Sequence, residues 1–359
     1  MTFLNRFLLL TAMLTVTKHY SQVKFEISSF NNYVIRDSVK SITYSFDSGS
    51  EHSNLFDKGK FDHKFGGISL IQNANGGFKF IKKGRIREDI PGLGNVRTNA
   101  NILANEEFAK DNCIPVDLLL GSRAMKNYTL HFDNKRGILS SVDLLPANID
   151  EYIKLELKHG FFDYDYYTFL EVNGHREKFL VDTGYSGQIA LESAEGLPSA
   201  SDSYSFFDLV AFRVSQTTLN RHDSAVVKHN DIIFKNNVVY SFSNNGMNII
   251  GNAFFLNFED VIFDLKNKCI YLRNEKERYD PFSDDIIFGA DADNNIHIVY
   301  IKSSSKYYVD GFRIGDQVVL EDKGLERRLL DSPCETIDIL RKWKLNNNGD
   351  FALSKVSSR

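Results

Sequence analysis

The chain repeats itself, and this repeat constrains the fold more than any other feature of its 359 residues. An apolar stretch ends in Asp-Ser-Gly at Asp47, and a second one ends in Asp-Thr-Gly at Asp182. Two apolar residues and a glycine follow each aspartate, 74 residues later at Gly121 and 69 residues later at Gly251. Since similarity at a fixed offset indicates repeated structural units, the sequence predicts two similar halves.

Strand signals surround these anchors. Asn173-Gly174 lies between two apolar runs and predicts a type I′ hairpin, because both residues tolerate positive φ. Two further antiparallel pairs are expected around polar turns, and a short helix is expected at 253–258. The paired segments are 128–132 with 138–142 and 261–264 with 269–273. The prediction is two β lobes, residues 22–148 and 149–278.

An aspartate at the end of a strand, followed by glycine, lies on a tight turn where its carboxylate can reach a cleft. A single copy is more often a surface turn in which the aspartate caps its own backbone. Two copies related by a pseudo-twofold axis would bring Asp47 and Asp182 together, and adjacent carboxylates share one proton because both cannot ionise. The ionised member can then activate a water while the other protonates a peptide carbonyl, which requires no metal or cofactor.

The neighbouring residues have predicted supporting roles. The hydroxyls of Ser48 and Thr183 can bond to the opposite loop and fix the two carboxylates in one plane. Gly49 and Gly184 complete the two tight turns. Glycine is expected at positions 121 and 251 because the apolar segments that they end would thread closely behind the aspartate loops.

The two halves resemble the lobes of pepsin-like and retropepsin-like aspartic proteases over about residues 23–275. The resemblance rests on FLVDTG and on the run from IIGNAFF to FEDVIFDLKNKCIYLR in the second half, with a looser match in the first. It implies a mainly β, two-lobed acid-protease β-barrel fold. It also implies that Asp47 and Asp182 are a catalytic pair and that the substrate is a peptide or protein.

Two departures from the family pattern affect the details. The first lobe has no Tyr or Trp between Glu51 and Asn127, so Phe78 or Phe80 is the candidate flap residue, beside a pair of glycines. Ser50 can donate its hydroxyl to the first carboxylate, whereas the second lobe has Tyr185 at this position. We therefore expect an acidic pH optimum that lies above about pH 3.

Residues 279–359 follow a charged linker and are predicted to form a third, small α+β unit. The run VDGFRIGDQVVLEDKGLE resembles a segment of PDZ domains, with Phe312 in the usual leucine position. Ser332-Pro333-Cys334-Glu335 predicts the start of a long helix. The tripeptide Phe288-Gly289-Ala290 is the candidate carboxylate-binding loop. Either this unit binds the C-terminal end of a peptide, or it is a PDZ-shaped lid without a ligand.

The N-terminal residues predict export. Arg6 precedes an apolar run that is too short to span a bilayer, so residues 1–21 are expected to be a signal peptide of a periplasmic or secreted protein without a transmembrane segment. The formal charge of −4 and the lack of a basic stripe disfavour nucleic-acid binding. Three distant cysteines indicate buried thiols instead of disulfides or a metal site.

These features favour an aspartic endopeptidase with a PDZ-like module. The alternatives are a catalytically inactive protein that binds peptides through the same two-lobed fold, and a β-rich surface adhesin, which leaves the doubled aspartate turns unexplained.

Overall fold

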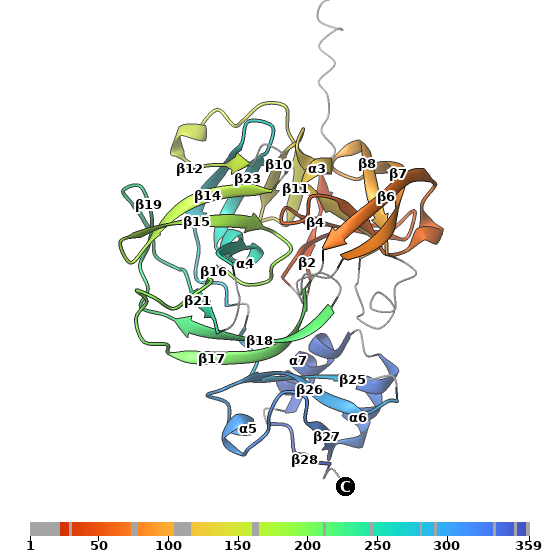
Figure 1. Ribbon diagram of the computed structural model, residues 1–359, viewed down its shortest axis with the longest axis vertical. Coiled ribbons are helices and arrows are strands. Elements are labelled where there is room, and N and C mark those ends of the chain that lie inside the picture. The colour runs from red at the N-terminus through yellow and green to blue at the C-terminus, as the bar shows by residue number, and fades with distance from the viewer. Residues whose placement is uncertain are drawn as a thin grey trace, which may run out of the picture.

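The computed structural model describes residues 22–28, 31–72, 78–103, 116–159, 165–210, 213–243, 247–280, 282–290, 293–332, 335–347 and 350–356. The expected signal peptide, the Gly76-Gly77 turn, Cys113 and Pro333-Cys334 lie outside these residues. The chain is mainly β, as the sequence predicts (Figure 1).

The first lobe is built on an eight-stranded sheet with the order β2-β3-β4-β9-β5-β8-β7-β6. A 3-10 turn, η1 (Lys58–Lys60), precedes β6, and the short helix α3 (Ser122–Met125) follows β9. The strands are β2 (Glu26–Ile27), β3 (Tyr33–Asp37), β4 (Ile42–Asp47), β5 (Ser53–Leu55), β6 (His63–Gln72), β7 (Phe78–Ile90), β8 (Gly94–Ile102) and β9 (Leu118–Gly121).

The second lobe repeats this order as β14-β15-β22-β16-β21-β18-β17. The pairing directions also repeat, since β15 and β22 are parallel like β4 and β9, and β16 and β21 are parallel like β5 and β8. The strands are β13 (Lys158–His159), β14 (Tyr166–Val172), β15 (His175–Asp182), β16 (Ile189–Leu191), β17 (Asp202–Val210), β18 (Arg213–His222), β19 (Val227–His229), β20 (Ile232–Phe234), β21 (Val239–Phe242) and β22 (Ile249–Gly251), followed by α4 (Asn252–Phe255).

A third, six-stranded sheet joins the two lobes and is itself symmetric. Its order is β1-β11-β10-β23-β24-β12, with the central strands β10 and β23 antiparallel. Both predicted hairpins of this region are confirmed by the pairing of β10 with β11 and of β23 with β24. The elements are β1 (Val23–Lys24), β10 (Thr129–Asp133), β11 (Ile138–Ser141), η2 (Ile149–Glu151), β12 (Ile153–Glu156), β23 (Phe258–Asp264) and β24 (Cys269–Glu275).

Local sequence explains several of these elements. Asn173 and Gly174 have φ values of 49° and 85° and connect β14 to β15, which confirms the predicted hairpin turn. The expected helix at 253–258 is present as the shorter α4. Cys269 is a buried free thiol, as predicted. One apolar cluster, which includes Tyr44, Phe132, Phe263 and residues from both lobes, forms their common core.

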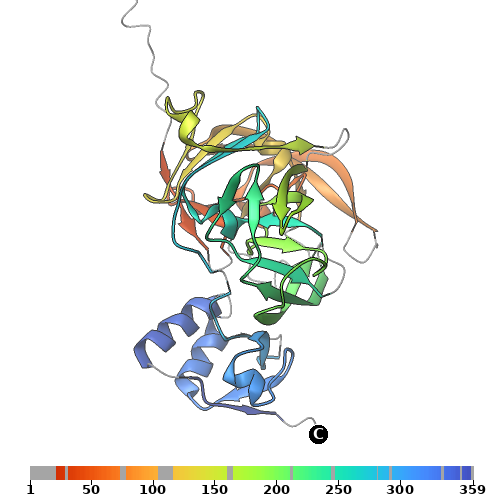
Figure 2. The same ribbon diagram turned by 90° about the vertical axis from the view of Figure 1, so that its left-hand side faces the viewer.

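The C-terminal unit comprises the elements from β25 to β28 and has its own apolar cluster. Its strands form the order β26-β27-β28, with β25 on the other side of β26, and α-helices accompany them (Figure 2). The elements are β25 (Ile286–Ala290), β26 (Ile296–Lys302), α5 (Lys306–Val309), β27 (Gln317–Leu320), α6 (Lys323–Asp331), α7 (Thr336–Asn347) and β28 (Leu353–Lys355).

Two expectations for this unit meet different outcomes. The long helix predicted after Ser332 is confirmed as α7, although Ser332 itself is the C-cap of α6. The prediction that Phe288, Gly289 and Ala290 form a carboxylate-binding loop is wrong, because these residues belong to strand β25 and pair with β26. Phe288 is 1% exposed and packs edge-to-face on Phe351, so its apolar ring places this segment in the core instead of in a loop.

The C-terminal unit continues the sheet of the second lobe. Strand β17 pairs with β26, with Tyr204 opposite Lys302 and Phe206 opposite Tyr300. Figure 1 shows these strands side by side at the junction, away from β6 and β7 of the first lobe. Among the described residues, no helix has both the length and the apolar character that crossing a membrane requires.

Candidate functional site

The two motif aspartates occupy equivalent positions in the two lobes. Asp47 is the last residue of β4 and lies opposite Gly121 of β9, and Asp182 is the last residue of β15 and lies opposite Gly251 of β22. Both aspartates are partly exposed to solvent. The strand ends thus hold each carboxyl group on a rigid support while leaving it accessible.

The residues after the aspartates connect the two loops by four crossed hydrogen bonds. The Ser48 amide donates to Thr183 Oγ1 at 3.0 Å, and the Thr183 amide donates to Ser48 Oγ at 3.1 Å. The Ser48 hydroxyl donates to the Val181 carbonyl at 2.7 Å, and the Thr183 hydroxyl donates to the Phe46 carbonyl at 3.1 Å. The predicted hydroxyl bonds across the lobe interface are therefore present, in symmetric form.

Glycines allow the two loops to approach each other. A Cβ atom on Gly49 would lie 2.3 Å from Cγ of Asp182, and one on Gly184 would lie 2.7 Å from Cγ of Asp47. Each turn glycine therefore faces the carboxyl group of the other lobe, which no larger residue could do without displacing it. The two carboxyl groups are close enough to share a hydrogen bond.

Backbone amides orient each carboxyl group. Oδ1 of Asp47 accepts from the amides of Gly49 and Ser50, both at 3.0 Å. Oδ1 of Asp182 accepts from the amides of Gly184 at 2.8 Å and Tyr185 at 3.2 Å. The two lobes therefore bind their carboxyls in the same way, although the fourth motif residue differs.

The prediction that the Ser50 hydroxyl contacts the carboxylate is wrong. This hydroxyl donates to the His52 carbonyl at 2.8 Å, because the side chain turns back along its own loop. The ring of Tyr185 lies over Gly187 and Gly251 in the second lobe. The side chains at this position thus shape the loop, and the amides contact the aspartates.

Gly121 and Gly251 lie where two backbones meet, as the sequence predicts. A Cβ atom on Gly121 would lie 2.5 Å from the carbonyl carbon of His52, and one on Gly251 would lie 2.3 Å from the carbonyl oxygen of Gly187. Neither position has room for a side chain. Strands β9 and β22 therefore pass directly behind the two aspartate loops.

The two carboxyls are electrostatically coupled. Burial, and then the adjacent charge of Asp182, raise the pKa of the Asp47 carboxyl well above its ordinary value. Burial also raises the pKa of Asp182, but the hydrogen bond with Asp47 and the loop amides oppose this shift. Both shifts favour a pair that carries one shared proton, because two adjacent carboxylates cannot both ionise.

The candidate flap is the hairpin of β6 and β7. The side chain of Phe78, at the start of β7, lies outside the described side chains, and Phe80 is 75% exposed. The ring of Phe80 therefore packs on little of the described protein, and the flap role stays a prediction. Lys83 of β7 lies 2.9 Å, Nζ to Nε2, from His52, which links the hairpin to the first aspartate loop.

Sequence reasoning missed a polar connection between the lobes. The Asn252 side chain donates to the Asn31 carbonyl at 2.5 Å, Asn31 donates to the Ser186 carbonyl at 3.3 Å, and the Tyr279 hydroxyl donates to Asn31 Oδ1 at 2.5 Å. Asn31 has a φ of 62° and is 4% exposed. No local pattern marks these residues, because their partners lie more than 150 positions away in the chain.

Metal sites and surface concavities are the other features that could support a function. In the part of the chain that the structure describes, no group of three or more His, Cys, Asp or Glu side chains could hold a metal ion. Two open concavities, of about 980 and 470 Å³, have linings that include neither Asp47 nor Asp182.

Comparison with known proteins gives limited matches. No family model and no curated protein sequence matches the chain. Among solved structures, the chain is similar to the basic 7S globulin from soybean, with a TM-score of 0.40 and 9% identity over 71% of this chain and 95% of that one. It is also similar to conglutin gamma, a basic 7S globulin from lupine seeds, with a TM-score of 0.40 and 11% identity over 71% of this chain and 96% of that one.

Proposed function

We propose that the protein is an aspartic endopeptidase that hydrolyses peptide bonds with a water held between Asp47 and Asp182. The observation that supports this most is the paired geometry of the two carboxyls, each facing the turn glycine of the other lobe. A surface turn that caps its own backbone would need neither this crossing nor the four hydrogen bonds between the loops.

The shared proton gives the two carboxyls complementary roles. The ionised member of the pair takes a proton from the attacking water, and the protonated member donates a proton to the oxygen of the scissile carbonyl. The result is a neutral tetrahedral diol, and its collapse returns a proton to the leaving amine. The bonds between Ser48 and Thr183 keep the two carboxyls in register throughout, since neither loop can turn without breaking them.

The shared proton also sets the pH range. Activity requires one proton on the pair, so the profile should be bell-shaped with limits that belong to the pair as a whole. Because burial and the charge of Asp182 raise the pKa of Asp47, the single-proton state persists to higher pH than for isolated carboxyls. We therefore expect a mildly acidic optimum, above about pH 3.

The test compares cleavage of an unstructured protein, such as reduced casein, by wild type and by Asp47→Asn and Asp182→Asn. Each substitution keeps the size of the side chain and removes one of the two carboxyl groups that the reaction needs. Each should lower kcat by roughly 100- to 10,000-fold. The matched control is Asp150→Asn, at an exposed position in η2, which should cleave like wild type.

Two results would overturn the proposal. One is equal cleavage by wild type and both dyad variants. The other is binding of peptides by wild type without cleavage at any pH between 3 and 8, which would support the inactive, peptide-binding alternative. Circular dichroism of each variant shows whether a loss of activity reflects a loss of fold.

A further inference from the structure

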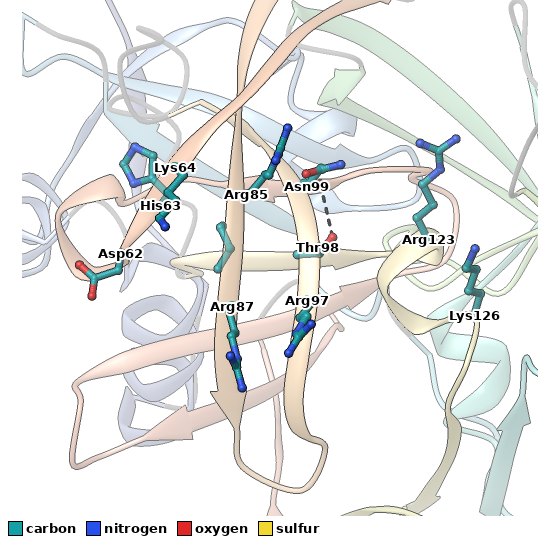
Figure 3. A pocket seen from close by; sticks show the side chains of 11 residues that line it. Asp62, His63, Lys64, Arg85, Arg87, Arg97, Thr98, Asn99, Arg123 and Lys126 are labelled. Carbon is teal, nitrogen blue, oxygen red and sulfur yellow. Dashed lines mark hydrogen bonds between the residues drawn. The ribbon is translucent and has the colours of Figure 1, made fainter.

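A basic groove lies on the first lobe, between β6, β7, β8 and α3. It is an open concavity of about 980 Å³, and Figure 3 shows that its lining includes positively charged side chains from or next to each of these elements. We name as the basic groove the surface formed by Lys64, Arg85, Arg87, Arg97, Arg123 and Lys126. These residues are scattered over 63 positions of the sequence, which is why no basic stripe is visible there.

The charges of the groove are not balanced. Asp62 also lines the groove, and Arg123 pairs with Glu51. Among the described residues, no carboxylate, Asp62 included, forms an ion pair with Lys64, Arg85, Arg87 or Arg97, although Arg87 donates to the side-chain oxygen of Asn95 at 3.1 Å. The smaller concavity of about 470 Å³ differs in this respect. Its four basic side chains each contact a carboxylate, in the pairs His131 with Asp260, Lys135 with Glu259, Arg136 with Asp133 and Arg273 with Asp260.

Two cations of the groove lie directly opposite each other in the sheet, which lowers the stability of this strand pair. Arg87 and Arg97 are direct partners across β7 and β8, and their side chains project next to each other (Figure 3). Like charges directly opposite each other destabilise an antiparallel pair. Since folded proteins keep such local conflicts mainly at functional positions, the unpaired cations indicate a ligand that neutralises them.

We propose that the basic groove binds an extended, acidic segment of a partner protein. Side chains on one face of an extended peptide repeat every 6.6 to 6.8 Å or so, the same spacing that separates Arg85 from Arg87 along β7. Carboxylates on that face can therefore meet the guanidinium groups in register, and arginine binds carboxylates with two parallel hydrogen bonds.

Other anionic partners fit the groove less well. Its described lining contains no Phe, Tyr or Trp on which the base of a single-stranded nucleic acid could stack. A membrane presents a flat surface, whereas the cations here line a concavity. The shape and the chemistry of the groove thus favour a narrow, flexible, acidic chain.

The test measures the binding of fluorescein-labelled octaglutamate by fluorescence anisotropy at pH 7 in 50 mM salt. Wild type should bind, and the affinity should fall steeply in 500 mM salt because the Debye length shortens several-fold. The double variant Arg85→Glu/Arg97→Glu should lose at least ten-fold in affinity. The matched control, Lys266→Glu/Lys342→Glu, changes the net charge equally at exposed positions outside the groove and should bind like wild type.

A second readout separates binding from structure. In the single variant Arg97→Glu, a glutamate faces Arg87, so the thermal midpoint should stay level or rise while octaglutamate binding falls. A fall in the midpoint by several degrees would show instead that Arg97 has a structural role, and would overturn the argument. The measurement needs no turnover, so it succeeds or fails independently of the proposed peptidase activity.

Three further results would overturn the proposal. These are no binding of octaglutamate by wild type in 50 mM salt, an equal loss in the matched control, and tighter binding of a dT oligonucleotide or of phosphatidylglycerol vesicles through the same arginines.

Discussion

The two lobes contain equivalent hairpins that differ in what they contact. In the first lobe, β6 is the last strand in the order of its sheet, and no other described strand pairs with its outer edge. In the second lobe, β17 has the equivalent position, but β26 of the C-terminal unit pairs with it. The same strand order therefore gives one free hairpin and one that is held by a third part of the chain.

Side-chain packing follows this difference. Tyr204 of β17 is fully buried and packs with Tyr240, Phe282 and Tyr300. In the first-lobe hairpin, large apolar side chains are more than half exposed, namely Phe65, Ile68, Leu70 and Phe80. An apolar edge strand with free backbone groups is a hazard that proteins usually cover.

The comparison shows how a duplicated fold can divide its tasks. The second-lobe hairpin cannot move without breaking the sheet that it shares with β26, whereas the first-lobe hairpin can close without breaking any described strand pairing beyond its own lobe. The flap hypothesis is therefore assigned to the first-lobe hairpin. The second-lobe hairpin is the structural attachment point of the C-terminal unit.

The largest effect on stability is expected from replacing Arg221, which connects the second-lobe hairpin to the segment that leads into the C-terminal unit. Arg221 donates to the Tyr204 hydroxyl at 2.9 Å, to Asp280 at 2.7 Å and to Asp223 at 2.9 Å, and its side chain is 8% exposed. Arg221→Met leaves the buried Tyr204 hydroxyl and Asp280 without this donor, while Asp223 keeps Arg278. The variant should therefore lower the free energy of unfolding in urea by about 3 kcal/mol. Hydrogen exchange should accelerate in β17 and β26.

The matched control is Arg87→Met in the first-lobe hairpin, which has no described carboxylate partner. Its free energy of unfolding should stay within about 0.5 kcal/mol of wild type. Equal losses in the two variants would show that the two hairpins do not differ in attachment.

A smaller effect is expected from pH at the same junction. Burial alone would raise the pKa of Asp202 in β17, but hydrogen bonds from Ser304 and Ser303 and the charge of Lys302 hold it below its ordinary value of 3.8. A lowered pKa in the folded state stabilises the protein above pH 3.8, and this contribution is lost as the pH falls through the folded-state pKa.

Asp202→Asn should therefore destabilise the protein by about 1 kcal/mol at pH 7, and the difference from wild type should shrink below pH 3.8. Thermal midpoints at pH 7 and pH 3 measure this. Asp62→Asn, at an exposed position beside the first-lobe hairpin, is the control and should match wild type at both pH values. A difference for Asp202→Asn that grows toward acid pH would contradict the sign of the shift.

The sequence predicted much of the site because its determinants are local. The aspartate and glycine anchors lie at strand ends, and their spacing repeats, so the close passage of the segments that end in Gly121 and Gly251 behind the aspartate loops followed from the pattern. The hydroxyl bonds of Ser48 and Thr183 followed from the same symmetry.

What the sequence could not predict depends on long-range packing. The basic groove combines cations from four elements, and Asn31 contacts residues on the far side of the lobe interface. Phe288 was assigned to a loop ahead of an expected strand, but its ring is buried and the residue lies in β25. The pairing of β17 with β26 joins two segments that no motif connects.

The smallest effect on stability is expected at the tip side of the first-lobe hairpin. Phe80→Ala removes a ring that is 75% exposed, so the free energy of unfolding should change by no more than about 0.5 kcal/mol. If the hairpin closes over a bound peptide, the ring becomes buried only in the complex. The variant should then lose roughly 10-fold in kcat/KM, because burial of a phenylalanine contributes about 1.5 to 3 kcal/mol and part of it is retained by alanine.

The matched variant in the other hairpin is Phe206→Ala, whose ring stacks on Phe282 at the junction with a centroid separation of 6.0 Å. It should show the opposite pattern, with a loss of about 1 to 2 kcal/mol in stability and nearly unchanged kcat/KM at a temperature where it is folded. Two outcomes would show that the first-lobe hairpin is not a flap. One is cleavage by Phe80→Ala at the wild-type rate, and the other is an equal loss of activity in both variants, because contact with the substrate would then not distinguish the two hairpins.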